Sequence, residues 1–269
     1  MATQDAVFAG SVPALYDRMM VPLIFEPYAQ DLARRAALVR PRTILETAAG
    51  TGVVTRALAT TVPNAHLVAT DLNEPMLAFA AGRQPHGARI EWRQADASAL
   101  PFDDQSFDLV VCQFGAMFFP DKIKSYREAR RVLRAGGRFL FNVWDRIAEN
   151  EFADVVTRSL AGVFPTDPPR FLARTPHGYC DTDRICDELR IAGFADPTVE
   201  AVEAISKAAS PLDAAIAYCQ GTPLRGEIEA RDVTALEGAT KAAATALAER
   251  FGGGPIQGRI RAFVFAATR

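Results

Sequence analysis

The sequence predicts an α/β fold: a doubly wound, mostly parallel sheet of seven strands with helices on both faces and a helical cap. Between residues 42 and 143, short apolar runs alternate with amphipathic stretches, as they do in repeated parallel β-α units. Small residues from Ala48 to Gly52 follow the first apolar run, where a tight turn from strand to helix needs them. Residues 205–256 have a mostly helical pattern and are too many for a connecting loop, which predicts the cap.

Each expected element follows from a local pattern. The expected strands are 42–46, 66–71, 89–94, 107–114, 138–143, 198–204 and 260–266. The expected helices are 53–59, 74–83, 122–133, 152–160, 182–192 and, with breaks at 221–223, 211–251. Asn73 and Thr182 can cap two of these helices, and Gly136-Gly137 should end the helix at 122–133. Before the first strand, residues 12–39 are helical in pattern, with interruptions expected at Pro13, Pro22 and Pro27.

Three parts are expected along the chain. Residues 1–41 form an N-terminal helical segment that covers the ligand-binding edge of the sheet. Residues 42–204 and 257–269 form the α/β core, and residues 205–256 form the helical cap between the last two strands.

Composition excludes several classes of function. The net charge is −2 and the lysine and arginine residues are spread along the chain, so no basic surface for nucleic acid is expected. No apolar run approaches the ~18 residues that span a bilayer, which predicts a cytoplasmic protein without membrane insertion. The four cysteines lack the spacing of zinc ligands, so no metal is expected. The alanine-rich helices after Pro211 could pack against a second copy, which makes a homodimer possible.

Polar side chains follow four of the expected strands at their carboxyl ends. Glu46, Asp71, Asp96 and Gln113 would therefore converge on one edge of the sheet, where open α/β sheets bind ligands. Asp71 lies 19 residues after Gly52, the distance at which an acid meets ribose hydroxyls in nucleotide-binding sheets.

The neighbouring residues suit a purine. Asp96 is placed to accept a hydrogen bond from an exocyclic amine, and Leu72 and Met76 could enclose the ring. A carboxylate at Glu46 would accept hydrogen bonds from an amine or hydroxyl and would repel a pyrophosphate. These residues favour a ligand that contains a ribose and a purine.

In these motifs the chain resembles the class I S-adenosylmethionine-dependent methyltransferases, in the methyltransferase type 11 group that includes ubiquinone and menaquinone biosynthesis methyltransferases. The matching segments, in order, are Tyr16-Asp17, Glu46 to Gly52, Asp71, Asp96-Ala97, Phe107 to Phe114 and the turn from Leu133 to Arg138. The resemblance covers about residues 44–143.

The resemblance implies a Rossmann-like fold, S-adenosyl-L-methionine as cofactor and a small-molecule substrate. It implies that Glu46 orients the network around the methionine amino group, Asp71 binds the ribose and Asp96 binds the adenine amine. The implied cofactor-binding residues are Tyr16, Glu46, Ala48, Gly50, Thr51, Gly52, Asp71, Leu72, Met76, Asp96, Ala97, Gln113 and Phe114. One position departs from the family pattern: Ala48 stands where the first glycine is usual. Because alanine tolerates positive φ poorly, either the turn differs slightly or φ is negative there.

The methyl acceptor is harder to predict. Transfer from a sulfonium mainly needs the nucleophile to be positioned and water to be excluded, so the resemblance assigns no catalytic residue. The aromatic and aliphatic residues near the expected transfer site suggest a small, partly apolar acceptor. The candidate substrate-binding residues are Phe25, Tyr28, Met117, Phe118 and His177.

Two alternatives remain at the level of the sequence. An NAD-dependent enzyme would share the strand, the small-residue turn and the ribose acid, but Glu46, Ala48 and the Asp96-Ala97 pair argue against it. A methyltransferase-fold protein that binds the cofactor, or nothing, could instead act as a sensor or partner subunit. The lack of an obvious base leaves room for this second alternative.

Overall fold

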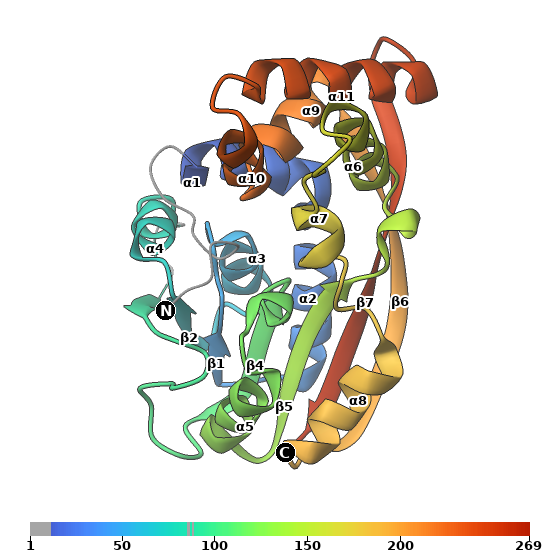
Figure 1. The fold of residues 1–269 in the computed structure, drawn as a ribbon. Coiled ribbons are helices and arrows are strands. Elements are labelled where there is room, and N and C mark those ends of the chain that lie inside the picture. Colours follow the sequence, from blue (N-terminus) through green and yellow to red (C-terminus); the bar gives the residue numbers. More distant parts are fainter. Residues whose placement is uncertain (1–11, 85–86, 88) are drawn as a thin grey trace. The chain divides into compact units, whose positions relative to one another are not determined.

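The computed structural model describes residues 12–84, 87 and 89–269. In this part of the chain seven strands form one sheet in the order β3-β2-β1-β4-β5-β7-β6 (Figure 1). The strands are β1 (Thr43–Glu46), β2 (His66–Asp71), β3 (Ile90–Gln94), β4 (Phe107–Gln113), β5 (Leu133–Trp144), β6 (Ala195–Ala208) and β7 (Ile256–Thr268). Strand β1 pairs in parallel with β2 and β4, β2 with β3, and β4 with β5. The predicted doubly wound, mostly parallel sheet is confirmed.

The helices alternate with these strands. They are α1 (Val12–Leu15), η2 (Tyr16–Phe25), α2 (Glu26–Val39), α3 (Val53–Thr61), α4 (Glu74–Ala81), η3 (Ala116–Phe118), α5 (Lys122–Val132), η4 (Ile147–Glu149), α6 (Glu151–Val163), α7 (Phe171–Arg174), α8 (Thr182–Ile191), α9 (Pro211–Gln220), α10 (Leu224–Arg231) and α11 (Leu236–Phe251). None of the helices in the described residues is long and apolar enough to cross a membrane.

The chain divides into two compact units. The core unit comprises Glu26–Val143, Cys180–Val202 and Ala262–Arg269, and the helical unit comprises residues 12–25, Trp144–Tyr179 and Glu203–Arg261. The division differs from the expected three parts because α2 belongs to the core unit and Trp144–Tyr179 to the helical unit. The first eleven residues of the expected segment 1–41 lie outside the described residues.

Helices cover both faces of the sheet in the core unit. Leu140 of β5 joins an apolar cluster built from α2, α3 and the neighbouring strands. Its neighbours Phe139 and Phe141 point to the other face, where their ring centroids lie 5.8 and 5.4 Å from that of Tyr126 in α5. Helix α5 in turn packs against α8 (Figure 1).

The helical unit is held together mainly by its own helices. Helix α11 packs against α9 and α6, and α9 also contacts η2 and α10 (Figure 1). Because α6 packs on these later helices, the segment from Trp144 to Tyr179 joins them rather than the core.

Two local expectations are corrected by the structure. Helix α5 ends at Val132 and β5 begins at once with Leu133, so Gly136-Gly137 lies inside a strand. The register shifts there, since Phe107 faces Leu133 while Leu109 faces Arg138. This bulge explains the glycine at position 136, whose φ is +74°. Helix α8 is capped by Asp181 rather than Thr182, because the Asp181 side chain accepts a hydrogen bond from the Arg184 N–H.

The prolines near the N-terminus do not interrupt the helical segment. Pro13 and Pro27 are each the second residue of a helix as the structure assigns it, where the fixed φ of proline is compatible with helical backbone. Pro22 lies within η2, a ten-residue π-helix with wider turns. Helices α1, η2 and α2 therefore follow one another directly.

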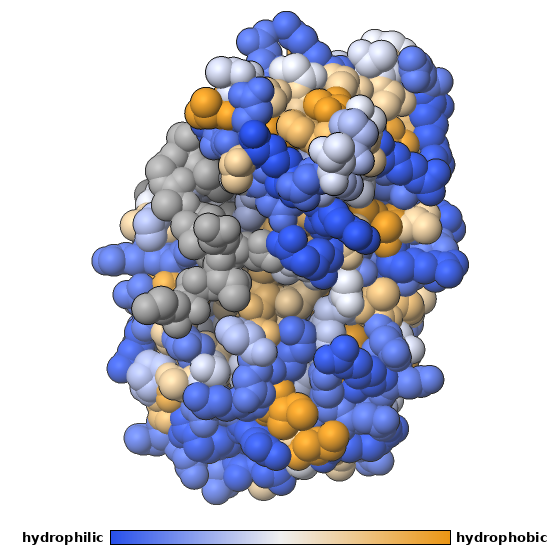
Figure 2. All heavy atoms as spheres, in the orientation of Figure 1, coloured by the Kyte–Doolittle hydropathy of each residue, from blue (hydrophilic) through white to orange (hydrophobic). Residues whose placement is uncertain are grey.

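The face shown in Figure 2 is mainly hydrophilic, with apolar side chains in small separate groups. The most exposed of the large apolar side chains are Leu38 and Val233. Isolated exposed apolar residues are normal on protein surfaces.

Candidate active site

The backbone after β1 forms a loop that bends back toward β2 and β4. Ala48, Gly50 and Gly52 all have positive φ, at +53°, +56° and +79°. The Thr47 N–H donates to the Val111 carbonyl and the Ala49 N–H to the Thr70 carbonyl, each at 2.9 Å. The loop is therefore fixed to both neighbouring strands before it enters α3.

Ala48 adopts the left-handed conformation with φ +53°, which excludes a negative φ, the second of the two alternatives expected at this position. Its methyl group lies over Gly115, where a Cβ would be 2.5 Å from the Ala48 Cβ and 2.7 Å from the Cys112 Sγ. Glycine at 115 thus provides the space that the Ala48 methyl group occupies.

Glu46 is buried at the end of β1, with 1% of its surface exposed. Its Oε2 accepts a hydrogen bond of 2.6 Å from the Thr55 hydroxyl, and its backbone carbonyl accepts one from the Thr70 hydroxyl. Burial raises the pKa of this carboxyl to about 8. A positive charge placed beside Glu46 would favour the carboxylate and lower its pKa.

Asp71 is aligned by backbone donors at the end of β2. Its Oδ2 accepts from the Gly50 N–H and its Oδ1 from the Asn73 N–H, both at 2.8 Å. Burial raises the pKa of Asp71, and these N–H groups oppose that rise. Oδ1 also accepts from the Asn73 Nδ2 at 3.3 Å. An ionised carboxylate has about four acceptor positions, so Oδ2 can still accept a hydrogen bond from a ligand hydroxyl.

The residues expected to bind adenine lie partly together in the structure. Leu72 follows Asp71 with 42% of its surface exposed, whereas Met76 is buried. The Met76 methyl group lies 3.8 Å from the position of a Cβ at Gly50. The segment that carries Asp96 continues from the end of β2, since the Ala95 N–H donates to the Asp71 carbonyl at 3.0 Å.

Asp96 itself is exposed. Its Oδ1 accepts from the Ser98 N–H at 2.7 Å, and Ala97 is half-buried in the same turn. The exposed position of Asp96 leaves its second oxygen able to meet an amine.

The end of β4 holds a strained residue that links several candidates. Phe114 is buried with φ +50°, a conformation that costs a bulky residue free energy and occurs often at functional sites. Its ring meets the Tyr28 ring edge-on at 5.4 Å. Gln113, just before it, pairs in register with Asn142 of β5.

Asn142 is a residue that sequence reasoning missed. It is fully buried, and its Oδ1 accepts from the Phe114 N–H at 2.9 Å. A polar residue inside the apolar run Phe139 to Trp144 was the signal that could have identified it.

Two buried polar atoms near these strands lack hydrogen-bond partners among the described residues. They are the Thr51 hydroxyl and the Asn142 Nδ2. Buried polar groups normally have partners, so such atoms near the carboxyl ends of β1 and β5 fit a site that is completed by polar ligand groups.

The candidate acceptor-binding residues fall into both units. Met117 and Phe118 form the short helix η3 after Gly115 in the core unit, Met117 being buried and Phe118 half-buried. Tyr28, also in the core unit, donates its hydroxyl to the Val202 carbonyl at 3.3 Å.

Tyr16, Phe25 and His177 belong to the helical unit and lie in one row of aromatic rings. Tyr16 stacks on Phe25 at 5.1 Å, Phe25 lies 6.1 Å from Trp144, and Trp144 lies 5.9 Å from His177. The structure therefore brings together three residues that the sequence analysis proposed separately.

His177 is a buried neutral imidazole. Its Nδ1 lies 2.8 Å from the Asp145 carbonyl oxygen, which can only accept, so Nδ1 carries the hydrogen. Burial lowers the pKa of His177 to about 4. The Asp145 side chain is held by Arg261 at 2.5 Å, which fixes the segment that positions the imidazole.

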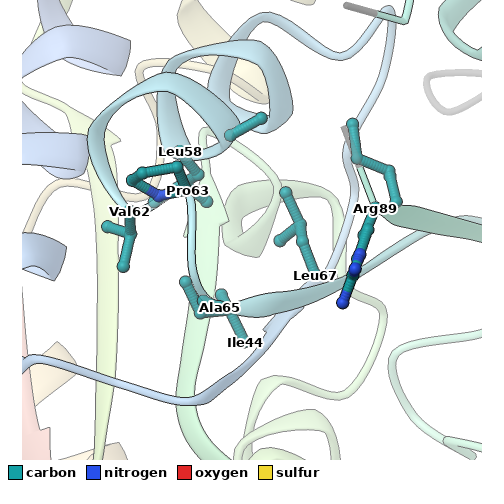
Figure 3. Close-up of a pocket in the computed structure, with 9 residues that line it drawn as sticks. Ile44, Leu58, Val62, Pro63, Ala65, Leu67 and Arg89 are labelled. Carbon is teal, nitrogen blue, oxygen red and sulfur yellow. The ribbon is translucent and has the colours of Figure 1, made fainter. Parts of the chain in front are cut away.

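A small pocket elsewhere in the core unit lies at the opposite end of the strands (Figure 3). It is lined by Ile44, Leu58, Ala59, Val62, Pro63, Ala65, Leu67, Arg89 and Ile90. These residues start β1, β2 and β3 and end α3, so the pocket has no part in the candidate site. The described residues include no group of His, Cys, Asp and Glu side chains that could hold a metal ion.

The fold and the site together define an α/β protein that binds a nucleoside cofactor at the carboxyl edge of its sheet. The methyltransferase domain family matches residues 45–141. The demethylmenaquinone methyltransferase of Clavibacter sepedonicus is 34% identical over 171 residues, which are 60% of this chain and 69% of that enzyme. This chain belongs to the class I S-adenosylmethionine-dependent methyltransferases, and its cofactor is S-adenosyl-L-methionine.

Two further comparisons agree with this family. The ubiquinone/menaquinone biosynthesis C-methyltransferase UbiE of Hahella chejuensis is 41% identical over 137 residues, 48% of this chain and 55% of that enzyme. The solved structure of the YcgJ protein from Bacillus subtilis has a TM-score of 0.58 at 18% identity, and the superposition covers 90% of this chain and 98% of that one. The structural likeness supports the fold alone, and the family membership decides against the NAD-dependent alternative.

Proposed function

We propose that this methyltransferase transfers a methyl group to a ring carbon of a small quinol, the reduced form of a quinone. The observation that carries the proposal is the 34% identity to a demethylmenaquinone methyltransferase over 69% of its length. The apolar side chains around the end of β4, including Phe114 and Met117, support an acceptor that is partly apolar.

In this proposal the core unit binds the cofactor at the ends of β1 to β4. The bound cofactor supplies a methyl group on a sulfonium, which is already activated for in-line displacement. Asp71 would accept hydrogen bonds from the ribose hydroxyls. Gly50 and Gly52 would let the backbone approach the ligand closely. Leu72 and Met76 would contact the adenine ring, and Asp96 its amine.

The remaining cofactor residues act at the methionine end. Thr51 would gain through its hydroxyl the hydrogen bond that the described residues do not provide. Glu46 would lose its proton when an ammonium group binds beside it, because an opposite charge stabilises the carboxylate. The backbone at Ala48, with Gln113 and Phe114, would line the sulfonium side, and Tyr16 would reach the cofactor from η2.

Turnover of a quinol tests the proposal. The purified chain is incubated with S-adenosylmethionine and chemically reduced 1,4-naphthoquinone, and the product is analysed by mass spectrometry. We expect a product carrying one additional methyl group on carbon. Formation of S-adenosylhomocysteine with other acceptors, and none with naphthoquinol or its alkylated homologues, would contradict the quinol assignment.

Cofactor binding is tested with a matched pair of acidic residues. Asp71→Ala should abolish calorimetric binding of S-adenosylhomocysteine, because the ribose loses its acceptor. Asp103→Ala removes an exposed acid whose backbone carbonyl, rather than its side chain, accepts the Ser106 hydroxyl, and it should bind like the wild type. Equal loss in both variants, or in neither, would contradict the role of Asp71.

The expected homodimer and the expected location in the cytoplasm belong to the same proposal. Light scattering during size-exclusion chromatography tests the first, with a mass of twice 29.1 kDa expected. Cell fractionation tests the second, with the chain expected in the fraction that remains after membranes are removed.

A further inference from the structure

Asn142 occupies a place in the core unit that the cofactor residues leave unused. It lies near the carboxyl end of β5, directly opposite Gln113 of β4 in the parallel register. Its side chain has no exposed surface.

The orientation of the Asn142 amide follows from its partner. The Phe114 N–H donates to the Asn142 Oδ1 at 2.9 Å, and only an oxygen can accept from an N–H. The Nδ2 group and its two hydrogens therefore point away from that bond. Among the described residues Nδ2 has no hydrogen-bond partner.

A buried donor without a partner costs free energy, and a ligand oxygen removes this cost. The ligand group must be an acceptor, because Nδ2 can only donate. A carbonyl oxygen, a hydroxyl oxygen or a phenolate would each serve.

The strand order separates this donor from the residues proposed to bind the nucleoside. Asp71 and Glu46 lie at the ends of β2 and β1, whereas β5 lies on the far side of β4. Neighbouring strands are about 4.8 Å apart, so β5 is roughly 10 Å from β1. The ribose and adenine would be held on one side of β4, with the Asn142 amide on the other.

The residue beside this donor is the strained Phe114. The same Asn142 side chain stabilises the φ of +50° at Phe114 through its Oδ1. One amide thus holds the end of β4 with its oxygen and offers a donor with its nitrogen.

We propose that the Asn142 Nδ2 binds an oxygen atom of the methyl acceptor and so selects acceptors that carry a hydroxyl or carbonyl oxygen on the ring to be methylated. The inference rests on the proposed function for the nature of the ring. In a ring of this kind an oxygen with phenolate character activates the neighbouring carbon, and an N–H donor stabilises that oxygen.

The experiment compares two probes that differ by the oxygen. The protein is saturated with S-adenosylhomocysteine, and binding of 1-naphthol and 1-methylnaphthalene is measured by calorimetry. We expect the wild type to bind 1-naphthol at least tenfold more tightly. Equal affinity for the two probes in the wild type would overturn the proposal without any variant.

Asn142→Asp is the matched variant. It keeps an oxygen for the Phe114 N–H but replaces the N–H donors by a carboxyl group. At pH 8.5 the preference for 1-naphthol should fall to less than twofold, while affinity for S-adenosylhomocysteine stays within threefold of the wild type. An unchanged preference would overturn the proposal. A loss of cofactor affinity larger than the loss of preference would overturn it too, since the amide would then serve the cofactor.

The experiments can contradict the quinol assignment and the role of Asn142 independently of each other. A wild type that prefers 1-naphthol but does not methylate naphthoquinol contradicts the quinol assignment and leaves the role of Asn142 intact. A wild type that methylates naphthoquinol but shows no preference contradicts the role of Asn142 alone.

Discussion

At the scale of single residues, the protonation of Glu46 links folding to pH. Burial raises the pKa of Glu46 from 4.5 to about 8, so the folded chain keeps a proton that the unfolded chain loses above pH 4.5. The stabilising contribution of this proton is present at low pH and is lost as pH rises toward 8. A pKa that differs by one between the folded and unfolded chains corresponds to about 1.4 kcal/mol of stability.

Glu46→Gln should remove this dependence, because glutamine stays neutral and can still accept from Thr55. The variant should gain stability relative to the wild type as pH rises from 5 to 8, by up to a few kcal/mol. Urea unfolding at a series of pH values measures the difference. A difference that is constant across this range would contradict the raised pKa.

His177 gives the folding stability the opposite dependence on pH. Its pKa is lowered by burial from 6.5 to about 4, so the folded imidazole stays neutral while the unfolded one binds a proton. The wild type should therefore lose stability as pH falls from 6.5 to 4. His177→Asn, whose Nδ2 can still donate to the Asp145 carbonyl, should lose less over the same range.

Two variants together separate the structural role of His177 from its proposed contact with the acceptor. His177→Leu removes the hydrogen bond to Asp145 and should cost about 1 kcal/mol at pH 8, measured by urea unfolding. If His177 touches the acceptor, His177→Asn should lower turnover with naphthoquinol and leave S-adenosylhomocysteine affinity unchanged. Wild-type turnover in His177→Asn would limit the residue to its structural role.

At the scale of elements, the turn after β1 depends on a complementary pair of residues. Gly115→Ala would place a Cβ 2.5 Å from the Ala48 Cβ and 2.7 Å from the Cys112 Sγ. Such overpacking should cost about 1–3 kcal/mol. Adding Ala48→Gly should recover part of this loss, because the first clash disappears and glycine accepts the φ of +53°.

Denaturant unfolding of the two single variants and the double variant measures the coupling. We expect an interaction of at least about 0.5 kcal/mol in favour of the double variant. Strictly additive effects would show that the two positions do not share this space.

The sequence predicts elements better than it predicts their contacts. The positions of β2, β4 and α3 follow from apolar runs and local turn residues, which are properties of neighbouring residues. The need for glycine at 115 could not be predicted, because it comes from Ala48 in a different part of the chain. The bulge in β5 was missed for a different reason. The pair Gly136-Gly137 can signal either the end of a helix or a bulge in a strand.

In the site too, the sequence predicts which residues lie at the edge of the sheet better than it predicts their contacts. Its acids could be predicted because the ends of parallel strands meet at one edge, whatever the contacts there. The bond from the Gly50 N–H to Asp71 and the role of Asn142 depend on the detailed loop path and strand register. No local pattern determines the loop path or the register, although a polar residue inside an apolar run marks Asn142 as unusual.

At the scale of the whole molecule, cofactor binding should stabilise the folded chain. S-adenosylhomocysteine at 100 times its Kd should add about 2.7 kcal/mol, which corresponds to a rise in Tm of roughly 5–10 °C for a chain of this size. Thr51→Val removes a buried hydroxyl that has no partner among the described residues. The variant should melt at or above the Tm of the wild type without ligand and gain less from S-adenosylhomocysteine, as differential scanning fluorimetry would measure. An equal gain in both proteins would exclude a contact between Thr51 and the cofactor.

The order of the strands also bears on how the chain is synthesised. In the described sheet β6 pairs with β7 alone, and β7 lies between β5 and β6 although it follows both in the sequence. When β6 leaves the ribosome, the place of β7 between β5 and β6 is still empty. The sheet can therefore be completed only after β7 (Ile256–Thr268) has emerged, even if β1 to β5 assemble earlier.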